Sequence, residues 1–199
     1  MFLPFITNLL STTPQSLVTT GWIAVGLLLL VWALGTKREA YKESLASRLP
    51  HLVAMAICFA LIFDQSLPVG SMNRVWLVAS PWLVTVALVL CVGGWAVIIW
   101  ARAVLAGNWS STVMLRQGHE LVRRGPYAVV RHPIYTGGLL ALTGTALING
   151  RIRSAVGVIL LAGLLKVKSE SEERLMRHAF GLEYDRYCQS TGALIPRLR

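Results

Sequence analysis

Apolar stretches alternate with short polar segments along the whole chain. Residues 17–34 form an 18-residue uncharged run, close to the ~20 residues that a helix needs to cross a bilayer, with Trp22 and Trp32 near its ends as interfacial anchors. Residues 75–101 are also uncharged, and this 27-residue run is longer than one span requires. We therefore expect two transmembrane helices here, the second tilted or extending past the membrane, with Pro81 as a candidate kink.

A shorter apolar run, residues 52–63, lies between these two and is followed by Asp64. It reaches the length of a span only if residues 49–69 all contribute. Two further short runs, residues 134–148 and 154–165, are joined at Asn149-Gly150 and predict a tight helical hairpin. Small residues that would allow close helix packing are Gly93, Gly94, Gly137, Gly138, Gly144, Gly157 and Gly163.

The last part of the chain changes character at Lys166, where charged and apolar residues begin to alternate through Tyr187. This pattern predicts a helix that leaves the membrane and continues into water. The fold expected is all-α: a multi-pass membrane protein with about five transmembrane helices and a C-terminal cytosolic amphipathic helix. We expect two parts, residues 1–104 with three spans and residues 105–199 with the hairpin and the final helix.

Composition agrees with a membrane protein, because 55% of residues are hydrophobic, 14% are charged and the mean hydropathy is +0.60. The net charge of +10 is explained by sidedness rather than by nucleic acid. If the ends of the five spans alternate between two sides, 16 of the 19 lysines and arginines fall on one side and 3 on the other. The positive-inside rule then places the N-terminus outside and the polar segments at 118–135 and 166–199 in the cytoplasm, at the inner membrane if the source is prokaryotic.

Other features of the sequence narrow the class further. The three cysteines, Cys58, Cys91 and Cys188, lack metal-ligand spacing, so we interpret them as packing residues and expect no metal. The first charged side chain is Lys37, so the basic segment that begins a signal peptide is missing and the first apolar run is expected to remain in the mature protein.

The polar island at residues 118–135 carries the first candidate chemistry. Gly125-Pro126 signals a turn, and Pro133 suits the first turn of the apolar helix that follows. Arg131 and His132 are thus expected at a helix N-terminus, where free backbone N–H groups, the helix dipole and a guanidinium attract a carboxylate or phosphate. For Arg123 and its neighbour Arg124 we favour the simpler interpretation of a basic flank that fixes topology.

The second candidate is the acidic pair Glu172 and Glu173, about two turns beyond the last apolar run. Either carboxylate, facing Arg131 and His132, would bind an amine or a sulfonium. The simpler alternative is a set of surface pairs, because Glu170 precedes Arg174 by four residues and Glu173 precedes Arg177 by the same spacing. We interpret Phe180, Tyr184 and Tyr187 as packing residues.

Two segments together resemble one known family. HELVRRGPYAVVRHPIYTGG, followed after the hairpin by EERLMRHAFGLEYDRY and the closing Ile195-Pro196, is similar to the C-terminal half of the isoprenylcysteine carboxyl methyltransferase family of integral membrane enzymes, over residues 105–196. The resemblance implies S-adenosylmethionine as methyl donor, bound on the cytosolic side. The cofactor-binding residues that it implies are His119, Leu121, Val122, Gly125, Tyr127, His132, Pro133, Tyr135, Glu172 and Glu173.

One departure concerns the acceptor. Prenylcysteine enzymes resemble Asn-Phe/His-x-His just upstream of this region, whereas this chain reads Asn108-Trp109-Ser110-Ser111. The missing histidine leaves the cofactor fold in place and puts the prenylcysteine substrate in question.

The expected reaction is methyl transfer to a lipophilic carboxylate that enters from the bilayer between the third helix and the hairpin. A carboxylate is already ionised at neutral pH and needs orientation rather than a base. Arg131 is the catalytic candidate for that orientation, and Glu173, or Glu172, for holding the sulfonium. An amine acceptor would need a base, for which His132 or Glu173 is available.

Three alternatives remain open at this point. A phospholipid or small-lipid N-methyltransferase would share the cofactor element. A sterol-reductase-like membrane enzyme using NADPH has a similar C-terminal arrangement, although no G-x-G-x-x-G motif is present. A small channel or transporter would need ionisable groups inside its spans, and only Asp64 lies near one.

Overall fold

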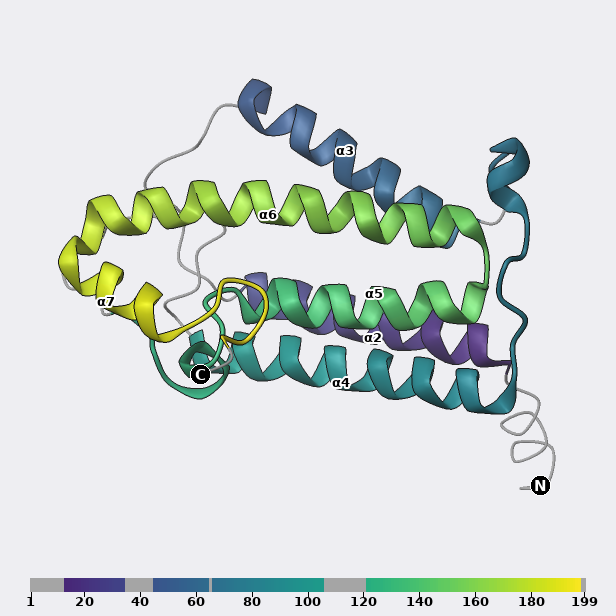
Figure 1. The fold of residues 1–199 in the computed structure, drawn as a ribbon, viewed down its shortest axis with the longest axis horizontal. Coiled ribbons are helices and arrows are strands. Elements are labelled where there is room, and N and C mark those ends of the chain that lie inside the picture. Colours follow the sequence, from purple (N-terminus) through teal and green to yellow (C-terminus); the bar gives the residue numbers. More distant parts are fainter. Residues whose placement is uncertain (1–12, 35–44, 65, 106–120, 198–199) are drawn as a thin grey trace.

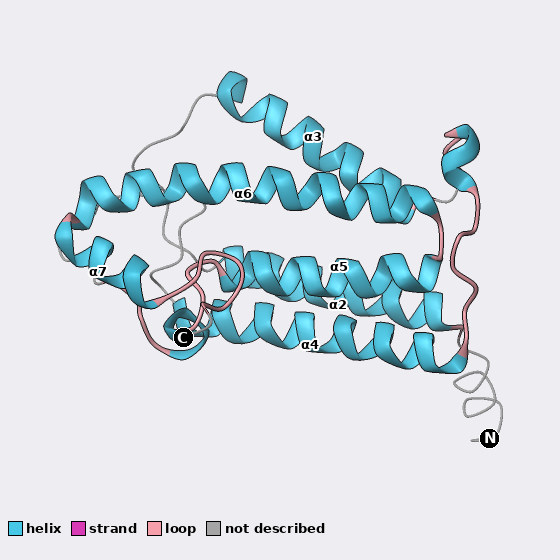
Figure 2. Ribbon diagram, viewed as in Figure 1, coloured by secondary structure: helices cyan, strands magenta, loops and turns pink. Residues whose placement is uncertain are grey.

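The computed structural model describes residues 13–34, 45–64, 66–105 and 121–197. Its helices pack side by side along one long axis, and along the chain they run alternately in opposite directions (Figure 1). Within the described residues, pairing of extended backbone is limited to two isolated bridges, so the expected all-α class is confirmed (Figure 2). The elements are α2 (Pro14–Leu34), α3 (Leu45–Phe63), η1 (Gly70–Asn73), α4 (Pro81–Leu105), η3 (Gly125–Ala128), α5 (Pro133–Asn149), α6 (Ile152–Phe180) and α7 (Leu182–Ser190).

Helices α4 and α5 touch backbone to backbone. A Cβ added to Gly94 would lie 2.4 Å from the carbonyl oxygen of Gly137, and one added to Gly144 would lie 2.4 Å from that of Ala87. In lipid, where burial of apolar side chains gives no extra driving force, small residues allow the close contact that holds helices together. The expectation of close packing is confirmed for Gly94, Gly137 and Gly144. In contrast, Gly93 and Gly138 face open space.

Helix α6 packs on α3 in the same manner, with Gly157 against the Ile62 side chain and the Cys58 carbonyl. Beside this crossing, the fully buried Arg153 donates through its guanidinium to the carbonyls of Leu61, at 3.3 Å, and Asp64. These carbonyls belong to the end of α3, where the helix dipole is negative and orphan acceptors need donors. A buried arginine therefore fixes the end of α3 to the start of α6.

Three boundaries differ from those expected. Pro81 does not kink the third span; it is the first residue of α4, where a proline costs no hydrogen bond, and residues 75–80 lie outside the helix. Helix α3 gains its length at its start rather than through residues 64–69, because it runs through Pro50 and ends at Phe63. The charged C-terminal helix is the uninterrupted continuation of α6 as far as Phe180, where Gly181, at φ 52°, separates it from α7.

Two helices of the described chain are long and apolar enough to cross a bilayer, Pro14–Ala33 and Pro81–Leu105. Leu49–Phe63 is a shorter apolar segment. Helix α6 has 29 residues and is therefore about 43 Å long, which exceeds the ~30 Å hydrocarbon core. That its charged second half leaves the membrane stays a prediction. The expected number of five crossings, and their orientation, stay predictions.

Candidate active site

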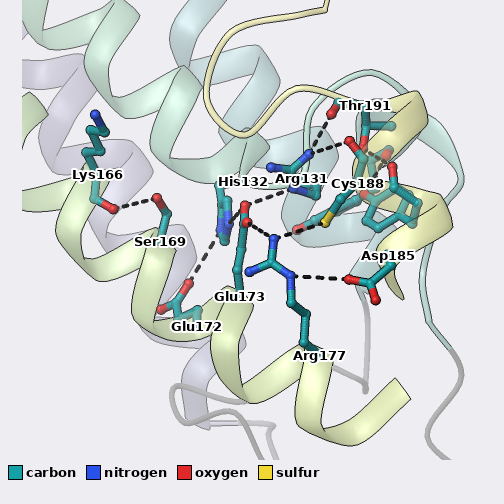
Figure 3. A network of polar contacts seen from close by, with 12 residues as sticks. Arg131, His132, Lys166, Ser169, Glu172, Glu173, Arg177, Asp185, Cys188 and Thr191 are labelled. Atoms are coloured by element: carbon teal, nitrogen blue, oxygen red, sulfur yellow. Dashed lines mark hydrogen bonds and ion pairs between the residues drawn. The ribbon is translucent and has the colours of Figure 1, made fainter. Parts of the chain in front are cut away.

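The site lies where the start of α5 meets the charged half of α6. The hairpin between these helices is antiparallel, so residues just before α5 come beside residues about two turns past the apolar part of α6 (Figure 1). Pro133 is the first residue of α5. The backbone turn just before it directs Arg131 and His132 toward Glu172 and Glu173 (Figure 3). The two polar segments that the sequence analysis singled out are therefore brought together.

A buried ion pair forms the centre of the site. The Arg131 Nε donates to a Glu173 carboxylate oxygen at 2.8 Å, and the two side chains are only 10% and 8% exposed. The Arg131 Nη1 also donates to the carbonyl of Thr191 at 2.5 Å and to that of Cys188 at 3.3 Å. Because buried charges are costly unless paired and hydrogen-bonded, this arrangement fixes Arg131 and Glu173 tightly against each other.

His132 lies between both carboxylates. Its Nδ1 is 3.4 Å from Glu172 Oε2, its Nε2 is 3.4 Å from Glu173 Oε1, and its ring stacks on Tyr135 with a centroid distance of 5.5 Å. Burial disfavours the charged imidazolium, but the two carboxylates outweigh burial and raise the pKa of His132 above its usual value. Burial likewise opposes ionisation of Glu173, yet His132 and Arg131 together lower the pKa of that carboxyl to about 2.

The two glutamates have different partners. Glu173 contacts two arginines, since Arg177 approaches its second oxygen at 3.3 Å in addition to Arg131. Glu172 accepts a hydrogen bond from the Tyr135 hydroxyl at 2.7 Å and is 25% exposed. Glu172 is therefore the more accessible carboxylate, and the expected surface pair of Glu173 with Arg177 is part of the buried network rather than an alternative to it.

The C-terminal tail closes over the same turn. Backbone N–H groups of Arg131 and His132 donate to the carbonyls of Gly192, at 2.9 Å, and Ala193, at 3.1 Å, and the Thr136 hydroxyl donates to Leu194 at 2.7 Å. The expectation of free N–H groups at this helix start is therefore wrong for these two residues, because the protein supplies its own acceptors. Sequence reasoning missed the tail, for which only the closing Ile195-Pro196 gave a signal.

The remaining predicted cofactor residues lie around η3. Tyr127 is buried and its carbonyl accepts from the Tyr187 hydroxyl at 2.6 Å, which joins η3 to α7. Gly125, at φ 62°, packs on Val104 at the end of α4. Leu121 and the adjacent Val122 are half-buried in the irregular segment before η3. His119 and residues 108–111 lie outside the described residues.

Comparison with known proteins gives matches to several methyltransferases. A model of the phospholipid methyltransferase family matches residues 82–183. A probable protein-S-isoprenylcysteine O-methyltransferase of Oryza sativa subsp. indica is 26% identical over 165 residues, covering 80% of this chain and 83% of that protein. A methanethiol S-methyltransferase of Pseudomonas sp. strain GM41(2012) is 25% identical over 160 residues, covering 75% of this chain and 60% of that one.

The fold is also that of a solved methyltransferase. The structure of the eukaryotic intramembrane Ras methyltransferase ICMT superposes with a TM-score of 0.63 at 21% identity, over 94% of this chain and 69% of that one. Fold and relatives together define an integral membrane methyltransferase. The chain belongs to the phospholipid methyltransferase family, and the resemblance to isoprenylcysteine carboxyl methyltransferases is confirmed. This outcome favours the methyltransferase interpretation over the reductase and the transporter.

Proposed function

We propose that this enzyme transfers a methyl group from S-adenosylmethionine to the carboxylate of a lipophilic molecule that reaches the site from the bilayer. The observation that carries the proposal is the meeting of Arg131 and His132 with Glu172 and Glu173 at the polar end of apolar helices. The name of the Oryza relative, an isoprenylcysteine O-methyltransferase, supports a carboxylate acceptor.

Glu172 is the residue that we assign to the cationic part of the donor. Its only described polar partners are a hydroxyl and an imidazole, and it is more exposed than Glu173. A sulfonium carries a full positive charge, which a carboxylate in a partly desolvated site stabilises. From the family resemblance, further cofactor contacts are proposed for His119, Leu121, Val122, Gly125, Tyr127, His132, Pro133 and Tyr135.

Arg131 and Glu173 were expected to act in catalysis, and their contacts favour positioning. Arg131 donates hydrogen bonds from its Nε to Glu173 and from its Nη1 to two carbonyls of the tail. Glu173 in turn is held by Arg131 and Arg177. We propose that this pair fixes His132 and the tail in place, so that Glu172 and the acceptor meet the donor in line.

The burial of the site favours an ionised acceptor over an amine. A carboxylate attacks without losing a proton, whereas a protonated amine requires a base. In methyl transfer from a sulfonium to a carboxylate, opposite charges are neutralised, so a site that excludes water favours this reaction. The 16 to 3 distribution of basic residues supports a site on the cytoplasmic face.

The test is methyl transfer in proteoliposomes with labelled S-adenosylmethionine. Four acceptors are compared: a farnesylated cysteine with a free carboxylate, its carboxamide, phosphatidylethanolamine and a long-chain alkanethiol. We expect label in the carboxylate acceptor alone, released as methanol by mild base, because a methyl ester is formed. Transfer to the amine or the thiol instead, or to none of the four, overturns the proposed acceptor.

A pair of matched variants tests the assignment of the donor site. Glu172→Gln removes the charge that we assign to the sulfonium and keeps the shape, so we expect S-adenosylmethionine to bind at least about tenfold more weakly. Glu170→Gln, on the exposed side of the same helix, serves as control and should bind the donor like the wild type. Equal binding by both variants would contradict the role of Glu172.

A further inference from the structure

The charges around His132 balance only when one more positive charge is present. The network contains two guanidiniums, Arg131 and Arg177, and three carboxylates, Glu172, Glu173 and Asp185, which lies 3.3 Å from Arg177. Without a charge on His132 this sums to one unpaired negative charge. With His132 protonated, the network is neutral, and Glu172 has the imidazolium as its cation.

Among the described residues, no charged nitrogen other than those of His132 lies within ion-pair distance of Glu172. Tyr135 stacks on the His132 ring and donates to Glu172 as a neutral phenol. Across the site, His51 of α3 lies within electrostatic range of Lys168 and Glu172. The neutral groups Tyr127, Tyr184 and Cys188 lie within electrostatic range of the two glutamates and remain protonated near pH 7, and the exposed Arg123 and Glu183 neutralise each other.

Resting on the proposed function, we infer that the proton on His132 occupies the electrostatic place of the donor's sulfonium, so that His132 selects between the charged methyl donor and its neutral product. The sulfonium and the imidazolium repel each other and compete for the same carboxylate, Glu172. Binding of S-adenosylmethionine therefore expels the His132 proton to solvent. S-adenosylhomocysteine, an uncharged thioether at this sulfur, binds with the proton in place.

The reaction step balances with this exchange. The methyl group leaves the sulfonium and forms a bond to a carboxylate oxygen, so the positive charge on sulfur and the negative charge on the acceptor disappear together. The network around Glu172 is then left one positive charge short, and His132 takes up a proton from water. Once His132 is protonated, the charges of the network balance without any contribution from the thioether product. Release of the product therefore requires no other charged group.

The expected measurement is a pH-dependent ratio of two affinities. When binding expels one proton, the affinity rises about tenfold for each unit of pH increase as long as the pH is below the pKa of the group that loses the proton. Above that pKa the affinity no longer changes with pH. We therefore expect the affinity of S-adenosylmethionine, relative to that of S-adenosylhomocysteine, to rise with pH and then reach a plateau. Titration calorimetry of the full chain in lipid nanodiscs, between pH 5.5 and 8.5, measures both affinities.

Three variants separate His132 from other titrating groups, including the amino group of the ligands themselves. In His132→Asn the part of the pH dependence that belongs to the protein should vanish, leaving only that of the ligands. His178→Asn, exposed on the same α6, should keep the wild-type profile. His51→Asn should keep it as well, and loss of the pH dependence in that variant would assign the effect to His51 and overturn the inference.

A second readout does not depend on a variant that folds. In two buffers with different ionisation enthalpies, the observed heat reports how many protons the wild-type protein releases. We expect close to one proton more for S-adenosylmethionine than for S-adenosylhomocysteine at a pH below the plateau, after correction for the ligands. If the homocysteine ligand fails to bind a folded protein, the proposed function is wrong. If it binds and both ligands release the same number of protons, only the present inference is wrong.

Discussion

Two neighbouring parts of α5 are held by different interactions: its middle packs closely on α4, and its start is held by the polar network. Along α4 and α5, Gly94, Gly137 and Gly144 bring two backbones together, and shape alone determines the fit. At the start of α5, Arg131 and Glu173 are held by charge, with geometry set by hydrogen bonds to the tail. The first should be sensitive to added volume and insensitive to pH, and the second the reverse.

The largest effect is expected from Arg131→Ala. This change leaves Glu173 buried without its closest cation and frees two tail carbonyls, which should lower the free energy of unfolding by about 3–5 kcal/mol. Thermal unfolding in detergent measures the loss. The matched control is Arg123→Ala, whose pair with Glu183 is 41% and 57% exposed and should contribute less than about 1 kcal/mol. Similar losses in both variants would show that burial does not distinguish these pairs.

Of these two regions, only the polar network should make the free energy of unfolding depend on pH. The pKa of Glu173 is lowered from 4.5 to about 2, so its contribution is present above pH 4.5 and is lost as the pH falls toward 2. The pKa of His132 is raised above 6.5, so its contribution is present below pH 6.5 and is lost as the pH rises through the folded value. Stability should be greatest between these limits, and the acid loss should be on the order of 2–3 kcal/mol.

Thermal unfolding from pH 2.5 to 9 checks this profile. In Glu173→Gln the acid limb should flatten, and in His132→Asn the alkaline limb should flatten. An unchanged acid limb in Glu173→Gln would assign the acid loss to carboxylates elsewhere in the chain.

A smaller effect is expected in the helix contact itself. In Gly94→Ala the new methyl group meets the Gly137 carbonyl oxygen and the Ala141 nitrogen, so α4 and α5 must separate, at a cost of about 1–3 kcal/mol. Gly93→Ala, one residue earlier and facing open space, should be neutral or stabilise by up to about 1 kcal/mol. Unfolding at two pH values should give the same difference, because no titrating group is involved.

The smallest effect is expected from one hydrogen bond between the helices. Trp22 Nε1 donates to the Thr145 hydroxyl at 3.0 Å, which links α2 to α5. Thr145→Val keeps the volume and should cost about 0.6 kcal/mol, the typical value for such bonds in membranes. Thr143→Val is the control, since Thr143 donates to Leu139 of its own helix. A loss above about 2 kcal/mol for Thr145→Val would place this link among the main determinants of packing.

Features with a periodic or charged signature were predictable from the sequence. The hairpin turn and the meeting of Arg131 with Glu173 follow from the order of apolar and polar runs, because an antiparallel hairpin aligns its two polar ends. The close-packing glycines were predicted in part, since Gly93, Gly138 and Gly163 face open space. The start of α4 at Pro81 was not predicted, since apolar residues before the helix continue its hydrophobic pattern. The tail was not predicted because Gly192 and Ala193 contribute backbone carbonyls, which every residue type has.

The expected division at residue 104 stays a prediction. It separates α4 from α5 in sequence, and these two helices share the glycine contact described above. The roles of the site residues toward donor and acceptor are likewise predictions, built on the contacts between Arg131, His132, Glu172 and Glu173.

The pairing of the tail with the start of α5 has a consequence for biosynthesis. Arg131 donates to a carbonyl that lies 60 residues later in the chain. While the ribosome is still translating α6, residues 191–193, whose carbonyls accept from Arg131 and His132 in the folded protein, do not yet exist. The contacts that fix Arg131 can therefore form only after both helices of the hairpin and residues 191–193 have been synthesised.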